Sequence, residues 1–128
     1  GVMLRLCFFL LSILAAAPAA AREPYTDADI GTVRAADLPG EARETLALIR
    51  RGGPFPYHKD GATFGNFERR LPARPRGYYR EYTIPTPGAR DRGARRIVAG
   101  QGATGDVRTA GEYYYSDNHY RSFRKIRE

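Results

Sequence analysis

The residues best suited to chemistry are two glutamates, one histidine and a run of arginines, all in the second half of the chain. They are Glu68, Glu81, His119 and the arginines between Arg90 and Arg96. Carboxylates and imidazoles exchange protons at mildly acidic to neutral pH, and guanidinium forks pair with phosphate oxygens. Taken singly, each residue has a plainer interpretation as part of a solvated face or of the core. Only their combination indicates a site.

The sequence predicts neither a metal nor a cofactor. His58 and His119 lie far apart, and the one cysteine, Cys7, is near the start of the chain, so no ligand set has the spacing of a zinc site. There is no P-loop, dinucleotide fingerprint or G-x-S-x-G elbow. His58 lies in a turn-rich segment, and we expect it to have no role.

The N-terminal segment has the pattern of a secretory leader. Arg5 precedes 16 uncharged residues that become alanine-rich towards Ala21, and this stretch is shorter than the roughly 20 residues of a membrane-spanning helix. We predict a signal peptide at 1–21, a flexible mature N-terminus at 22–29 and one small domain at 30–128. An uncleaved anchor is the alternative. After cleavage we expect a secreted protein with no membrane attachment.

The charge of the chain favours a polyanionic partner. The net charge is +7, or +6 without Arg5, and 19 of the 21 basic residues are arginine. Nucleic acid, a membrane surface or a cell-wall polymer would all fit this charge. Composition alone therefore leaves the partner open.

Helical periodicity predicts one amphipathic helix at 38–51. Asp37 is the candidate N-cap, Pro39 falls in the first turn, and Gly52 and Gly53 end the helix. Short runs rich in tyrosine and β-branched residues, separated by turn signals, predict strands. These runs are 77–84, 95–99, 113–115 and 119–126. We predict an α+β domain in which the helix packs on a twisted antiparallel sheet.

Four motifs occur in one order along this predicted domain. They are FGNFERRLP at 64–72, YYREYT at 78–83, PGARDRGARRI at 87–97 and DNHYRSF at 117–123. With the helix segment and the run GPFPY at 53–57, they resemble the barnase-like guanyl-specific ribonucleases, nearest the short streptomycete branch. The resemblance spans about Ile30 to Ile126 and implies the microbial ribonuclease fold.

The resemblance implies metal-independent cleavage of single-stranded RNA on the 3′ side of guanosine. Glu81 corresponds to the general base and His119 to the general acid. Arg92 and Arg96 correspond to the arginines that bind the scissile phosphate and stabilise the transition state. The product would be a 2′,3′-cyclic phosphate, which water then opens with the two roles exchanged.

The resemblance also implies a guanine site at residues 64–68. Glu68 corresponds to the glutamate that accepts the guanine N1–H and amino hydrogens, and backbone amides near Asn66 and Phe67 complete the base edge. Phe64 and Tyr120 correspond to positions that flank the nucleotide. The predicted binding residues are Phe64, Gly65, Asn66, Phe67, Glu68 and Tyr120.

Two positions depart from the nearest branch. Where that branch has arginine, this chain has Phe67, which either forms an aromatic sandwich with Phe64 around the base or packs into the core or over the loop. Arg34 stands where the first cysteine of a disulfide would fall. We therefore expect a domain without that bridge and less stable than those relatives.

The alternative to an enzyme is a basic RNA-binding or interaction protein on the same scaffold. A membrane- or wall-binding protein would explain the charge but not the motifs. The resemblance further implies a monomer and, as a partner, a small acidic inhibitor of the barstar type, which the charge of +6 would attract.

Overall fold

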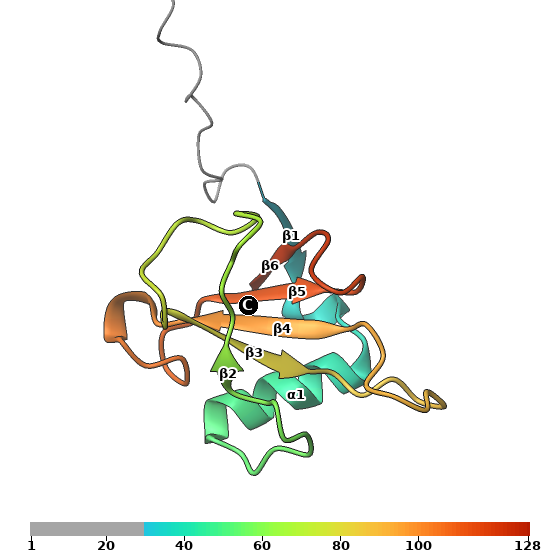
Figure 1. Ribbon diagram of the computed structural model, residues 1–128. Helices are drawn as coiled ribbons and strands as arrows, with labels where there is room; N and C mark the ends of the chain where they lie inside the picture. The colour runs from blue at the N-terminus through green and yellow to red at the C-terminus, as the bar shows by residue number, and fades with distance from the viewer. Residues whose placement is uncertain (1–29) are drawn as a thin grey trace, which may run out of the picture.

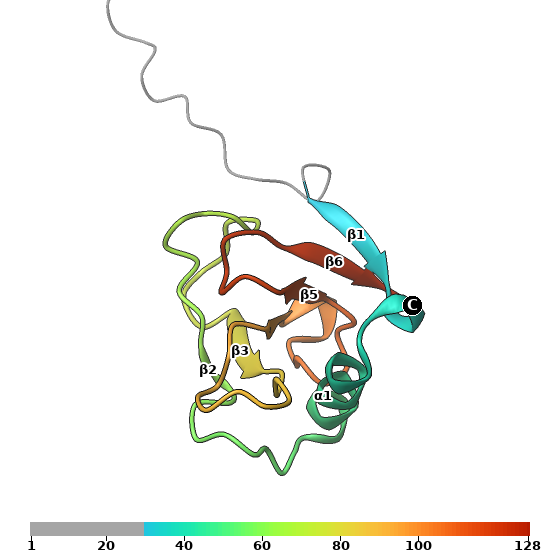
Figure 2. The same cartoon turned by 90° about the vertical axis from the view of Figure 1, so that its right-hand side faces the viewer.

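The computed structural model describes residues 30–128, so the predicted leader at 1–21 and the segment at 22–29 lie outside the described residues. One helix packs against one curved sheet (Figures 1 and 2). The helix α1 spans Gly40–Arg51. The strands are β1 (Gly31–Arg34), β2 (Ala62–Thr63), β3 (Tyr79–Thr83), β4 (Arg96–Gly100), β5 (Tyr113–Ser116) and β6 (Arg124–Arg127). Two short 3-10 turns are η4 (Ala35–Asp37) and η5 (Gly102–Thr104).

The sheet confirms the predicted α+β class with one addition. Its strand order is β1-β6-β5-β4-β3-β2, and four of the five neighbouring pairs are antiparallel. The fifth pair, β1 with β6, is parallel. The strands β1 and β2, which form the two edges of the sheet, were not predicted from the sequence.

The predicted helix is present, but its predicted N-cap is wrong. Asp37 ends the 3-10 turn, and Pro39 occupies the N-cap without a side-chain hydrogen bond. Leu38 is extended, with φ −74° and ψ 152°, as expected for a residue before proline, so the α-helix starts two residues later than predicted. At the other end, Gly52 has φ 84° and its N–H donates to the carbonyls of Leu48 and Ile49, which confirms the predicted stop.

Strand alternation separates the two faces of the sheet. One face packs against the buried stripe of α1 and holds Tyr82, Ile97, Tyr113 and Tyr115. The opposite face carries a second apolar cluster, Ile30, Leu71, Tyr79, Val98, Tyr114 and Phe123. Glu81 alternates with Tyr82 along β3, and Arg96 alternates with Ile97 along β4, so both charged residues belong to the face without the helix.

The predicted strand at 119–126 is only partly correct, because its first half is a turn. His119 and Tyr120 have φ values of 56° and 73°, in the left-handed region that ends an extended strand. β6 therefore begins at Arg124. The other predicted strands are confirmed with shifts of one or two residues at their ends.

Candidate active site

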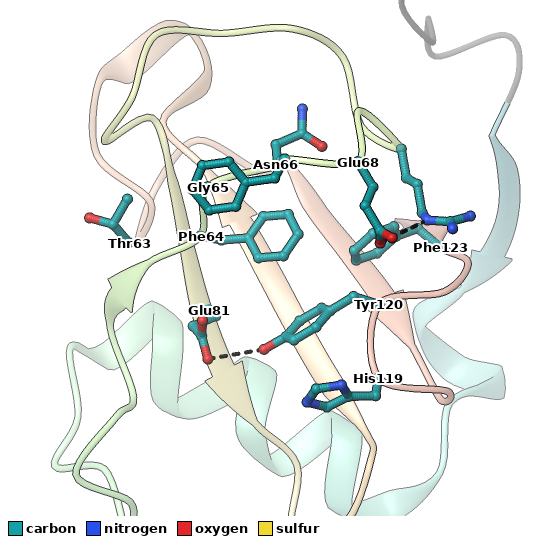
Figure 3. Close-up of a pocket in the computed structure, with 11 residues that line it drawn as sticks. Thr63, Phe64, Gly65, Asn66, Glu68, Glu81, His119, Tyr120 and Phe123 are labelled. Atoms are coloured by element: carbon teal, nitrogen blue, oxygen red, sulfur yellow. Dashed lines mark hydrogen bonds and ion pairs between the residues drawn. The ribbon is translucent and has the colours of Figure 1, made fainter.

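A cavity of about 410 Å³ opens on the sheet face that α1 does not cover (Figure 3). Its lining residues are Thr63, Phe64, Gly65, Asn66, Phe67, Glu68, Arg70, Glu81, His119, Tyr120 and Phe123. All the predicted guanine-binding residues and two of the four predicted catalytic residues, Glu81 and His119, are therefore brought together. Arg92 and Arg96 are not part of the lining.

Glu81 occupies the middle of β3, opposite Ala62 of β2 and Val98 of β4. Its Oε1 atom accepts a 3.0 Å hydrogen bond from the hydroxyl of Tyr120. Burial, followed by the negative charge of Glu81 and this hydrogen bond, raises the pKa of Tyr120 well above the ordinary tyrosine value. The hydroxyl therefore stays protonated as a donor, which leaves Oε2 of the carboxylate for another partner.

A left-handed turn presents His119 beside Tyr120. Two adjacent non-glycine residues with positive φ store strain of about 1–3 kcal/mol each, so the surroundings must impose this conformation. The N–H of His119 donates to the Ala94 carbonyl at 2.9 Å, and the N–H of Tyr120 donates to the buried Ser116 hydroxyl at 2.9 Å. The His119 side chain is exposed at the cavity mouth, and its ring centroid lies 4.9 Å from that of Tyr120.

Ser116 and Asn118 have a supporting role that was not predicted from the sequence. The Ser116 hydroxyl donates to Oδ1 of Asn118 at 3.0 Å, and the same oxygen accepts the Ser122 N–H at 3.0 Å. These bonds close the turn that carries His119. The only sequence signal was the turn-forming composition of residues 116–118.

Arg96 is a buried cation with unused donor capacity. Its side chain is on the cavity face of β4, and the residue is 2% exposed. Its Nη1 donates to the carbonyls of Gly93 and Arg95, while Nε has no hydrogen-bond partner among the described residues. The guanidinium carbon lies 5.8 Å from the ring centroid of Tyr120. A desolvated guanidinium with a free N–H favours an anion as its next neighbour.

Arg92 reaches the same end of β3 from the loop before β4. Its Nη1 donates to the Thr83 hydroxyl at 2.7 Å, and Thr83 is the cross-strand neighbour of Arg96. Arg92 and Arg96 are therefore both tied to one strand pair, two residues along β3 from Glu81. The Thr83 contact was not predicted.

Asn66 organises the predicted guanine loop through its side chain. It has φ 53°, which asparagine tolerates better than most residues. Its Oδ1 accepts the N–H of Leu71 at 3.1 Å, and its Nδ2 donates to the Leu71 carbonyl at 2.9 Å. The side chain is thus used within the loop, and the Asn66 carbonyl accepts the Arg69 N–H at 2.9 Å, so the backbone N–H of Asn66 remains for a ligand.

Glu68 lies at the cavity rim with a partner that was not predicted. Its Oε1 is 3.3 Å from Nε of Arg70, which itself donates through Nη1 to the Arg121 carbonyl at 2.7 Å. Arg70 therefore connects the loop at 64–72 to the turn that holds His119. Its position two residues after Glu68 was the only sequence signal for this pairing.

The two phenylalanines of this loop have opposite environments. Phe64 packs against Tyr120, with ring centroids 4.9 Å apart, and against Phe123. Phe67 is 84% exposed, so the core-packing interpretation is wrong. Its ring lies over Gly65, where an added Cβ would come within 2.5 Å of the Phe67 Cε2 atom, so a side chain at position 65 would displace the ring. Both rings line the cavity, and the sandwich remains a prediction.

His58, the second histidine, lies away from the cavity. It is exposed in the turn before β2 and is not part of the lining. Within residues 30–128 no three His, Cys, Asp or Glu side chains are grouped closely enough to hold a metal ion. Over the same range no helix has the length and apolar character needed to cross a membrane.

Comparisons of the sequence and of the structure with known proteins all find ribonucleases. Residues 19–127 match a family model described as ribonuclease. The guanyl-specific ribonuclease St of Saccharopolyspora erythraea is 53% identical over 92 residues, which cover 72% of this chain and 83% of that protein. Guanyl-specific ribonuclease Sa of Kitasatospora aureofaciens is 49% identical over 96 residues, covering 75% and 93%. A crystal structure of ribonuclease Sa2 with guanosine-2'-cyclophosphate aligns with a TM-score of 0.67 and 45% identity, over 77% of this chain and 96% of that one.

Proposed function

Because this chain belongs to the microbial guanyl-specific ribonuclease family, we propose that it cleaves single-stranded RNA on the 3′ side of guanosine. The observation that carries the proposal is that one cavity holds a candidate base-recognition loop at one end and two groups able to exchange protons at the other. Glu68 lies in the loop, and Glu81 and His119 are the two proton-exchanging groups.

Guanine fits the upper end of the cavity as drawn in Figure 3. A carboxylate can accept the N1–H and the amino hydrogen of guanine side by side, and Glu68 offers one there. Adenine presents an acceptor at N1, so the same carboxylate would face a lone pair. The side-chain bonds of Asn66 to Leu71 fix the loop backbone, whose N–H groups can meet O6.

The first chemical step needs a base and an acid on opposite sides of the phosphorus. Glu81 takes the proton of the guanosine 2′-hydroxyl, and the resulting oxygen attacks the adjacent phosphorus. The bond to the 5′-oxygen of the next nucleotide breaks, and His119 gives that oxygen its proton. A 2′,3′-cyclic phosphate results. Water then opens the ring, with His119 as the base and Glu81 as the acid.

The arginines act on the phosphoryl oxygens between these two groups. Negative charge builds up on those oxygens in the transition state, and a preorganised cation in a buried setting stabilises it strongly. Arg96 supplies a buried guanidinium whose Nε has no partner among the described residues. Arg92, held by Thr83, supplies a second guanidinium. This scheme assigns every step to the side chains of the protein itself.

The proposal is tested with guanylyl and adenylyl dinucleotides incubated with the purified domain in the presence of a chelator. Cleavage of guanylyl dinucleotides alone, undiminished by the chelator, supports it. No cleavage at any pH from mildly acidic to neutral contradicts it. Guanylyl-specific cleavage that disappears with the chelator would support the activity but contradict the metal-independent mechanism.

Export of the protein is part of the same proposal. Residues 1–21 have the charged start, the short apolar middle and the small residues of a signal peptide. Expression of the full chain in a secreting bacterium, followed by N-terminal sequencing of the protein in the medium, should give a start close to Arg22. Retention of the intact chain in the membrane fraction would instead identify an anchor.

A further inference from the structure

The segment that follows the candidate guanine loop is unusually basic. Between Glu68 and Glu81 there are five arginines and no acidic residue. Four of them lie in the loop from β2 to β3, which runs above the sheet in the view of Figure 1 (yellow-green), and the fifth, Arg80, lies on β3. Arg69, Arg74 and Arg76 are exposed; we call these three residues the arginine loop.

The charges of the arginine loop are not paired. In the described part of the chain, no carboxylate oxygen comes within 4.0 Å of a side-chain nitrogen of Arg69, Arg74 or Arg76. By contrast, the neighbouring Arg70 pairs with Glu68. The other nearby acid, Glu112, accepts hydrogen bonds from the hydroxyls of Tyr78 and Tyr114.

Aromatic rings accompany these guanidinium groups. The guanidinium carbon of Arg76 lies 6.0 Å from the ring centroid of Phe67, and that of Arg74 lies 5.3 Å from the ring of Tyr78. Phe67 is the one large hydrophobic side chain among residues 30–128 that is exposed, at 84%. Exposed aromatic faces next to arginines are what proteins use to stack bases and hold phosphates of a single strand.

The arginine loop is continuous with the cavity, because Phe67 lines the cavity and also contacts Arg76. A cavity of about 410 Å³ is too small for a long strand, so the rest of such a strand must leave it across the surrounding surface. On this side, that surface presents three positive charges that form no ion pair within residues 30–128. A polyanion with regularly spaced phosphates and stackable bases matches both features.

We propose that the arginine loop is a second RNA-binding surface, which holds the strand beyond the guanosine and makes long single-stranded RNA a better substrate than a dinucleotide. The proposal rests on the proposed function, since it places the substrate strand through the same cavity. It assigns Arg69, Arg74 and Arg76 to binding of the strand and not to the chemical step.

The test compares two triple variants of equal net charge. One replaces Arg69, Arg74 and Arg76 with glutamine. The control makes the same replacement at Arg34, Arg43 and Arg51, which are also exposed and form no ion pair among residues 30–128 but lie on β1 and α1. For each protein, kcat/KM is measured on a guanylyl dinucleotide and on an oligouridine of about ten nucleotides with one internal guanosine.

In the arginine-loop variant we expect unchanged cleavage of the dinucleotide and a decrease of about tenfold in kcat/KM on the oligonucleotide at low salt. The slope of log kcat/KM against log salt concentration should become less negative by about 2, since each of the three phosphates that an arginine no longer neutralises contributes roughly 0.7 to it. The control should retain the oligonucleotide preference. Equal decreases in both triple variants would show that only net charge matters and would overturn the proposal. An unchanged preference of the arginine-loop variant for the oligonucleotide over the dinucleotide would also overturn it.

A binding measurement separates this proposal from the proposed function. The same oligonucleotide with 2′-deoxyguanosine lacks the attacking hydroxyl, so its affinity can be measured whether or not the protein is catalytic. Weaker binding by the arginine-loop variant alone supports the surface, even if the wild type cleaves nothing. Vesicles containing phosphatidylserine serve as the other polyanion. If the variant loses binding to vesicles but keeps its affinity for the oligonucleotide, the surface is a lipid site and the proposal is wrong.

Discussion

The hydroxyl of Tyr120 donates a 3.0 Å hydrogen bond to Oε1 of Glu81, although the two residues are 39 positions apart in the chain. This bond joins the middle of β3 to the left-handed turn after β5. It fixes one oxygen of the carboxylate and leaves the other for a ligand in the cavity that Glu81 and His119 both line. The bond therefore links the candidate base to the segment that carries the candidate acid.

Replacement of Glu81 by glutamine should lower kcat on a guanylyl dinucleotide by about 10²–10⁴-fold, because an amide cannot accept the 2′-hydroxyl proton. The amide oxygen can still accept the Tyr120 hydrogen bond, so KM and the unfolding midpoint should change little. Glu44, exposed on α1, gives a matched control in which glutamine should leave kcat unchanged. A Glu81→Gln enzyme within tenfold of wild type would remove Glu81 from the mechanism.

His119→Gln should abolish the fall of kcat/KM on the alkaline side of the pH profile, because that side reports loss of the proton that the acid must give. The remaining activity should be about 10²-fold or more below wild type. The control is His58→Gln, which changes the other exposed histidine and should keep the full profile. If His58→Gln were the damaging change, the assignment would be reversed.

Asn66→Ala should raise KM for guanylyl dinucleotides more than it changes kcat, because the loop backbone loses its side-chain bonds to Leu71. The free energy of unfolding should fall by about 1–3 kcal/mol for the unsatisfied groups. Alanine also adopts φ 53° poorly, so Asn66→Gly should be more stable than Asn66→Ala by about 1 kcal/mol. Urea unfolding of both variants measures these differences. A glycine variant as stable as wild type would show that the Leu71 bonds contribute nothing.

The stability of the domain should fall at alkaline pH in part through Tyr120. The pKa of Tyr120 is raised by burial and by Glu81, so the folded state keeps the proton while the unfolded chain loses it near pH 10. This contribution is complete below about pH 10 and is lost as the pH rises further. The unfolding free energy of wild type minus that of Tyr120→Phe should therefore be constant up to about pH 9 and shrink above it. A difference that is independent of pH through this range would contradict the prediction.

Phe67→Ala tests the aromatic sandwich. Loss of stacking on the base should raise KM for a guanylyl dinucleotide about fivefold or more, at roughly 1 kcal/mol or more per stacked base. The unfolding midpoint should hardly move, since the side chain is 84% exposed. An unchanged KM would contradict the sandwich and would mean that Phe67 only packs over the loop at Gly65.

The periodicity of apolar residues predicted the helix and the inner strands, because these elements bury side chains at regular intervals along the chain. The apolar stripe of α1 and the tyrosine-rich pattern of β5 both reflect contact with the core. The edge strands escaped prediction because β1 is mostly exposed and β2 has two residues, so neither leaves a pattern of its own.

The sequence predicted several residues of the candidate site but not the contacts that they make. The motifs singled out Glu81, His119 and Glu68, all of which line the cavity. The left-handed turn at His119 was missed because side-chain bonds within residues 116–122 and a long-range bond from the His119 N–H to the Ala94 carbonyl hold it, and neither leaves a periodic pattern in the sequence. The pairing of Arg70 with the Arg121 carbonyl depends on the same tertiary closure.

The parallel pairing of β1 with β6 has a consequence for the order of folding. Its register joins Val33 to Ile126, so forming this pair closes almost the whole domain into one loop. Pairings of such long sequence separation form late, after local hairpins such as β3–β4. A chain cut before Arg124 would leave β1 without its neighbour and remove Ile126 from the helix-side core. During synthesis, the first strand of the domain can take its place only after the last strand has been made.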